Sequence, residues 1–192
     1  MIVRLARHAV PLCVASAVLF IAMTALEFLY FRQLSGGLAS LDLRFAGFTP
    51  DEGMAWLTAL GRRGSEIILV WHYLTFDLLF PALFSVTLIS LILATGRRLP
   101  RFRGMSERGQ SIFALLLVLP YTVADYVQNI VVARLLSNFL VANPDSLSLA
   151  SGLIVTKSVL ALVPILVILF FLLTGQRQRR ASERSTDTRE IS

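Results

Sequence analysis

Four long apolar runs constrain this chain more than any other feature of its sequence. They lie at about residues 10–31, 67–94, 111–137 and 149–174. About 20 consecutive apolar residues form a helix long enough to cross the hydrocarbon core of a bilayer. Hydrophobic residues make up 56% of the 192 positions and charged residues only 16%, so little is left for a soluble domain. The sequence therefore predicts an all-α integral membrane protein, a bundle of four transmembrane helices within residues 1–175.

Arginines set the expected orientation of these helices. They gather in three segments: Arg4 and Arg7 ahead of the first run, Arg97, Arg98, Arg101, Arg103 and Arg108 between the second and third, and Arg177, Arg179, Arg180, Arg184 and Arg189 after the fourth. Because loops rich in Lys and Arg stay on the cytoplasmic side, we expect both termini in the cytoplasm and the loops 32–66 and 138–148 outside. The first run exceeds the roughly 7–15 apolar residues of a signal peptide, which predicts a retained helix.

The first outer loop carries the signature of a short helix at 50–61. Thr49 is placed to cap its first turn and Glu52 to close a capping box, while Gly61 is placed to end it. We expect this helix at the membrane interface, with the Trp56 ring in the headgroup layer where indoles collect. The alternative is a solvated helix packed over the mouth of the bundle.

The last stretch, 176–192, is polar and basic and has no periodic apolar face. Such a composition is typical of disorder, which predicts a disordered cytoplasmic tail. Arginines near the cytoplasmic leaflet attract anionic lipid, each by about 1 kcal/mol. We therefore expect membrane lipids as partners, with anionic lipid at the cytoplasmic face, and no nucleic acid.

Polar and ionisable side chains inside the apolar runs are the best indication of a site. A charge in hydrocarbon costs on the order of 3 kcal/mol, so such residues are usually paired inside a bundle or line a hydrated cavity. Counting about 1.5 Å per helical residue from the outer ends puts four of them, Asp77, Asp125, Asn129 and Lys157, in one layer, with Glu27 and His72 nearer the outer surface. We expect the following residues to form a ligand-binding site or polar network: Asp77, Asp125, Asn129, Lys157, Tyr73, Gln128, Glu27 and His72.

Two interpretations of this set remain open. In the structural one, Lys157 neutralises Asp77 or Asp125 and the network only specifies how the helices pack. In the functional one, the set is a pocket for a ligand head group or a proton-accepting site. Two buried aspartates facing one lysine leave one carboxylate that is protonated, paired with Arg134 or open to a cation. Pro81, Pro120 and Pro164 each remove a backbone donor, and neighbouring side chains or water must then satisfy the freed carbonyls.

The sequence contains no motif for catalysis or for a cofactor. Cys13 is the only cysteine, and His8 and His72 are the only histidines, none of them in a cluster with metal-ligand spacing. Two histidines are also too few to hold a bis-histidine haem together with another ligand. We therefore expect no metal, no haem and no other cofactor.

A loose pattern of residues resembles a group of bacterial four-span membrane proteins of unknown function. It consists of Asp42, Gly47-Phe48-Thr49, Leu60-Gly61-Arg62-Arg63-Gly64, Asp77, Pro81, Pro120, Asp125 and Asn129. The group is expected to carry an acidic residue directly before the asparagine of the third span, where this chain has Gln128. The resemblance implies a multi-pass protein of the bacterial inner (plasma) membrane and implies no activity.

Three functions are compatible with these features. The absence of nucleophile–base pairs, metal ligands and phosphate loops favours a binding or accessory subunit over an enzyme, with a polar pocket open toward the outer face. Its partner would be an amphipathic ligand or another protein, and the sequence does not set an oligomeric state. The alternatives are a lipid-modifying enzyme with Asp77 or Asp125 as base and Lys157 stabilising negative charge, or a proton-coupled carrier.

Overall fold

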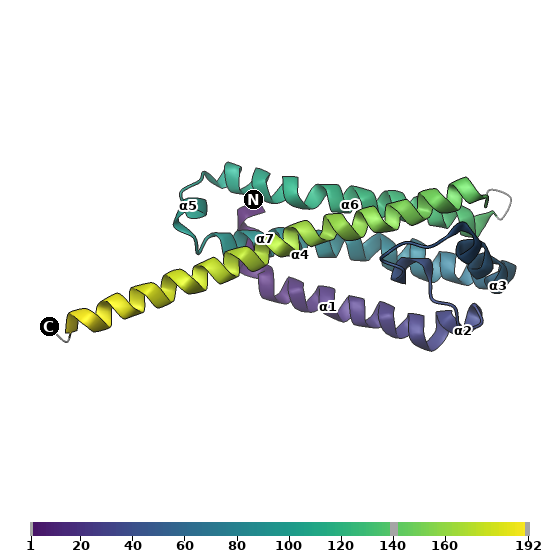
Figure 1. Ribbon diagram of the computed structural model, residues 1–192, viewed down its shortest axis with the longest axis horizontal. Helices are drawn as coiled ribbons and strands as arrows, with labels where there is room; N and C mark the ends of the chain where they lie inside the picture. The colour runs from purple at the N-terminus through teal and green to yellow at the C-terminus, as the bar shows by residue number, and fades with distance from the viewer. Residues whose placement is uncertain (1, 139–141, 191–192) are drawn as a thin grey trace.

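Four helical stretches run side by side in alternating directions along the long axis of the structure (Figure 1). All four are long and apolar enough to cross a membrane: Arg4–Leu34, Pro50–Gly96, Glu107–Ser137 and Pro144–Arg177. The computed structural model describes the backbone of residues 2–138 and 142–190 and the side chains of 4–138 and 142–177. Every element within that backbone is helical, which confirms the all-α class.

The first two stretches change helix type along their length. The first consists of η1 (Ile2–His8), α1 (Ala9–Leu26), η2 (Glu27–Phe31) and α2 (Arg32–Leu34). The second consists of α3 (Pro50–Ile68), η4 (Leu69–Phe76) and α4 (Asp77–Gly96). The third and fourth are α6 (Glu107–Ser137) and α7 (Pro144–Glu190), and the loops hold η3 (Leu41–Leu43) and α5 (Pro100–Arg103). The segments η2 and η4 are π-helical, and both lie near the loop that carries η3.

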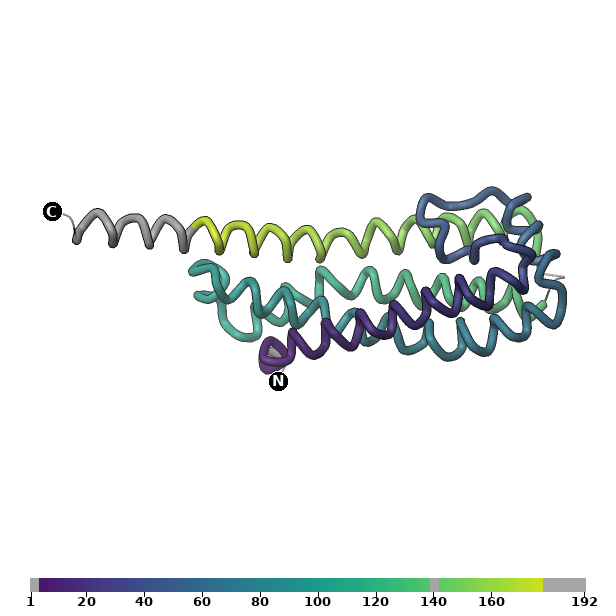
Figure 2. The backbone as a smooth tube through the Cα atoms, turned by 90° about the horizontal axis from the view of Figure 1, so that it is seen from below, coloured from purple at the N-terminus to yellow at the C-terminus, as the bar shows by residue number. Residues whose placement is uncertain are grey.

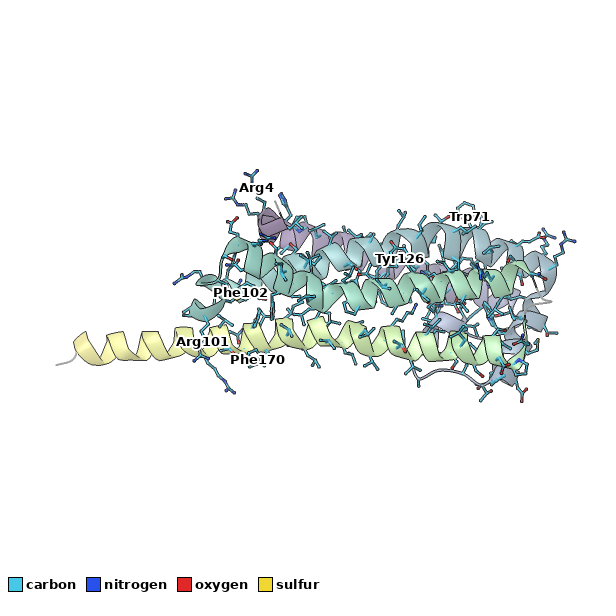
Figure 3. All side chains as sticks on the ribbon, turned by 90° about the horizontal axis from the view of Figure 1, so that it is seen from above. Arg4, Trp71, Arg101, Phe102, Tyr126 and Phe170 are labelled. Atoms are coloured by element: carbon cyan, nitrogen blue, oxygen red, sulfur yellow. The ribbon has the colours of Figure 1, made fainter. Side chains whose placement is uncertain are left out.

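Helix α4 is central, because it packs against α1, α6 and α7. Small hydroxyl side chains let these helices approach each other: Ser16 and Thr87 hydrogen-bond at 2.7 Å between α1 and α4, and Ser85 and Thr122 at 2.6 Å between α4 and α6. Figure 3 places Trp71 toward one end of the structure and Arg4 and Phe102 toward the other. We call these the α3 end and the α5 end.

The short helix expected at 50–61 is present, with its capping box. Thr49 donates its backbone N–H to Glu52 Oε2 at 2.7 Å, and its hydroxyl accepts from the backbone N–H of Glu52 at 3.3 Å. Gly61, at φ 59°, interrupts the helical backbone within α3 before the chain continues into the long second stretch. Such a positive φ strains residues that carry a Cβ, so the glycine allows the helix axis to change here.

The expectation that Trp56 lies in a headgroup layer is wrong, because its side chain is fully buried. Trp56 and Leu57 belong to a core cluster at the α3 end that also contains Phe31, Leu41 and Leu147. Figure 2 shows the segment from the loop into α3 lying against α7. Of the two arrangements considered, the helix packs over the bundle. An indole that can bury all its area against neighbouring helices gains more than one left at the surface.

A second core cluster fills the α5 end. It joins residues of α4 and α6 to Phe102 of α5 and Phe171 of α7, whose rings lie 5.5 Å apart. Gly96 is required here, because a Cβ at that position would lie 2.7 Å from the Phe102 ring.

The fourth helix is longer than its apolar run. Its backbone continues to Glu190, whereas the sequence predicted disorder from residue 176. An existing helix extends through polar residues without repeating the cost of nucleation. The side chains from residue 178 lie outside the described residues, so contact of the tail arginines with lipid stays a prediction.

Candidate functional site

Lys157 is the centre of a buried polar cluster near the α3 end. From α7 its ammonium donates to Asp125 Oδ1 at 2.7 Å and to Gln128 Oε1 at 2.6 Å, both on α6. It also donates to Asp42 Oδ1 at 3.1 Å. Asp125 is one of the two partners that the structural interpretation named, and its other oxygen accepts from the Tyr121 hydroxyl at 3.0 Å. The second carboxylate that contacts Lys157 is that of Asp42, not that of Asp77.

Asp42 is the residue that sequence reasoning missed as a site residue. It lies in η3, in the loop between the first two stretches, and its carboxylate reaches down to Lys157 and accepts a short hydrogen bond from the Tyr73 hydroxyl. Burial by itself raises the pKa of this carboxyl, but the charge of Lys157, the nearby His72 imidazole and the hydrogen bond from Tyr73 outweigh burial and hold its pKa well below the usual range. The available signals were a single acid between leucines, Leu41-Asp42-Leu43, and the place of Asp42 in the resemblance pattern.

His72 and Asp77 face each other beside Asp42. The Nε2 atom of His72 lies 3.3 Å from Asp77 Oδ2 and 3.5 Å from Asp42 Oδ2. Neither contact has hydrogen-bond geometry, and both ring nitrogens of His72 and Oδ2 of Asp77 are buried without a hydrogen-bond partner in the described residues. His72 is 6% exposed and Asp77 7%. These are the least satisfied ionisable groups of the cluster.

The π-helical turn of η4 brings His72 and Asp77 together. In an α-helix two residues five apart point about 140° away from each other. Here the backbone N–H of Asp77 donates to the carbonyl of His72, the five-residue bond of a π-helix, so the two side chains share a side. In η2 the N–H of Arg32 donates to the carbonyl of Glu27 in the same way. Both wide segments thus carry acidic or imidazole groups of the site.

Asn129 donates to a backbone carbonyl that Pro81 leaves without its helical hydrogen bond. Pro81 has no N–H to donate to the carbonyl of Asp77, four residues earlier, and Asn129 Nδ2 donates to that carbonyl at 2.9 Å instead. This confirms, at Pro81, the prediction that side chains satisfy carbonyls freed by proline. Asn129 thereby holds the turn that carries Asp77.

Glu27 ties the loop to the first stretch. It accepts from the backbone N–H of Ser40 at 2.9 Å and from the Ser40 hydroxyl at 2.5 Å, and Arg32 Nε lies 4.0 Å away. A third tie joins the backbone N–H of Phe48 to the Ser151 hydroxyl at 2.8 Å. The loop that carries Asp42 is therefore held over the helices at several points.

A cavity of about 390 Å³ adjoins the cluster. Its polar end consists of Glu27, Ser40, Asp42, His72, Asp77, Asp125 and Lys157, and its apolar wall includes Phe20, Met23, Phe80, Phe84, Tyr121, Ala161 and Leu162. Five of the eight predicted site residues line it, whereas Tyr73, Gln128 and Asn129 do not. The loop residues Ser40, Asp42, Leu43 and Phe45 also line the cavity. Phe20, Phe45 and Leu162 are each at least half exposed and mark an opening on the side between α1 and α7.

Comparison of the chain with protein-family models, with curated proteins and with solved structures finds no match. Function therefore has to be argued from the site alone.

Proposed function

We propose that the chain is a multi-pass membrane protein that binds an amphipathic ligand in the cavity between α1, α4, α6 and α7, as a binding or accessory subunit. The apolar tail of the ligand lies along the aromatic wall and its polar head lies at the buried charged cluster. Both termini are cytoplasmic in this proposal, and the α3 end faces outward from a bacterial inner membrane. The α5 end carries Arg97, Arg98, Arg101 and Arg103, as expected of a cytoplasmic side.

The observation that carries the proposal is the division of one cavity into an apolar wall and a polar end. Its volume of about 390 Å³ lies in the range of small-molecule sites, which are largely apolar with a few placed polar groups. The opening is rimmed by Phe20 and Leu162 rather than by charged residues. An apolar rim on helices that face lipid favours a ligand that enters from the bilayer over one that enters from water.

Bound lipid tests the proposal directly. The full chain purified in mild detergent should retain a defined lipid class, measured by mass spectrometry of the extract. Ala161→Trp adds bulk to the cavity wall and should remove most of that lipid, whereas Val163→Trp places the same side chain at an exposed position on the same helix and should not. Equal retention by both variants, with unfolding temperatures close to wild type, would contradict a ligand in the cavity.

A lipid-modifying enzyme is the second candidate, favoured by the unpartnered Asp77 Oδ2 at the cavity. Of the two aspartates considered as a base, Asp125 is held by Lys157 and Tyr121, which leaves Asp77 for proton abstraction. Lipid analysis of cells with and without the chain separates the two functions. A substrate that accumulates without the chain, and also with Asp77→Asn, supports the enzyme; an unchanged lipid profile supports the binding protein.

A further inference from the structure

We infer that Asp42, His72 and Asp77 form a binding site for a divalent transition-metal ion, with Zn²⁺ as the representative ion. One ligand atom from each residue lies within 4.8 Å of the other two. The three residues come from the loop turn η3, from the π-helical η4 and from the first position of α4. This inference does not depend on the proposed lipid ligand.

The distances within the cluster fit ligands around one ion better than they fit hydrogen bonds. Zn²⁺ is bound by imidazole nitrogen and carboxylate oxygen at about 2.0–2.2 Å, which separates the ligand atoms of a tetrahedral site by about 3.3–3.5 Å. The His72 Nε2 contacts measure 3.3 and 3.5 Å. In such a site the oxygens lie off the axis of the ring nitrogen and are not hydrogen-bonded to it, and neither of the two His72 contacts is a hydrogen bond.

The balance of charge around the cavity calls for two further positive charges. Four carboxylates gather there: Glu27, Asp42, Asp77 and Asp125. Among the described lysines and arginines, only Lys157 and Arg32 lie within 4.0 Å of them. Buried charges are stable only when they are compensated. With His72 neutral, as a metal ligand must be, one divalent cation supplies the two missing charges.

The carboxylate of Asp42 is already oriented for this role. Tyr73 donates to Asp42 Oδ2 and Lys157 to Asp42 Oδ1, and such partners fix a ligand and raise metal affinity. All three ligands also line the cavity, so an ion held by them keeps a position open toward a bound head group, as catalytic zinc sites do. The sequence predicted no metal because these ligands are brought together by the loop and the π turn, not by a local motif.

Metal titration tests the inference. The full chain is purified in mild detergent through a tag without histidine, stripped with a chelator and titrated with Zn²⁺ or Co²⁺. We expect one ion per chain and visible absorption bands of tetrahedral Co²⁺. His72→Gln and Asp77→Asn should each weaken binding by at least about tenfold, since even indirect partners of metal ligands contribute that much. His8→Gln and Asp51→Asn change exposed residues of the same types and should bind as wild type does.

X-ray absorption of the zinc-loaded wild-type chain keeps the inference testable if a variant does not fold. The expected spectrum shows one imidazole among nitrogen and oxygen ligands at about 2.0–2.1 Å. A shell without imidazole would overturn the inference, as would equal affinity in His72→Gln and His8→Gln, or no retained ion. If no ion is retained, protons on the carboxylates or on His72 balance the charge of the cluster instead. Lipid measured in the same samples separates this result from failure of the proposed ligand.

Discussion

The α3 end and the α5 end are built from the same four helical stretches, yet they are held together by different forces. At the α5 end, the helices pack through rings such as Phe102 and Phe171, and the buried hydroxyls bond in pairs or to the backbone. At the α3 end, two stretches widen into π-helical turns and enclose ions and a cavity. Buried ions are costly unless they are paired, so the α3 end adds to its apolar core a charged cluster that the α5 end lacks.

Loss of Lys157 should give the largest effect and confine it to the α3 end. Lys157→Met leaves Asp42 and Asp125 buried without their cation, and breaking a buried ion pair costs about 3–5 kcal/mol. Thermal unfolding in detergent measures the loss, with the exposed Arg63→Met as the matched control. Exposed ion pairs contribute at most about 1 kcal/mol. A variant whose free energy of unfolding stays within that range of wild type would mean that water reaches the cluster. Recovery on adding Asp125→Asn and Asp42→Asn would support the structural interpretation of the network.

A ring removed from the α5 end should weaken the fold without affecting the site. Phe102 is 6% exposed, and the centroid of its ring lies 5.7 Å from that of Phe113 and 5.5 Å from that of Phe171. Phe102→Ala should therefore cost about 3 kcal/mol, the lower end for a buried aromatic ring. Bound lipid and bound metal per folded chain should stay at wild-type levels. A fall in either would show that the two ends are coupled.

The pairing of Asn129 with the carbonyl of Asp77 predicts a non-additive pair of mutations. Asn129→Ala leaves a buried acceptor unsatisfied and should cost about 1–3 kcal/mol. In a Pro81→Ala background the restored N–H of residue 81 can take that carbonyl, so the same substitution should cost much less. A double-mutant cycle of unfolding free energies measures the difference. An equal cost in both backgrounds would contradict the role given to Asn129.

The hydroxyl pairs at the helix contacts should give the smallest effect. Ser16→Ala removes a bond to Thr87, which keeps its own bonds to the carbonyls of Leu12 and Leu83. Interhelical polar contacts in membranes average about 0.6 kcal/mol, and we expect a loss of that order in unfolding experiments. Thr156→Ala is the control, since its hydroxyl bonds within its own helix. A loss of unfolding free energy as large as that of Lys157→Met would contradict the proposed difference between the two ends.

The sequence predicted the helices and most residues of the polar cluster, but it left open which charges pair and did not include Asp42. Apolar runs and capping residues depend on neighbours in the chain, so the four long helices and the turn at Thr49 could be predicted. Trp56 was misplaced because the surface that buries it comes from other helices. Asp42 was missed because its distance to Lys157 depends on how the loop folds back, which no local pattern records.

By itself, the sequence determined where the long helices lie and which of them carry charge in apolar surroundings, since both follow from the cost of moving side chains out of water. The tertiary structure decided which charges meet. A π-helical turn puts His72 beside Asp77, and a loop fold brings Asp42 to Lys157 in place of Asp77. Attraction between buried charges depends steeply on separation, and only the packed chain sets separations between distant residues.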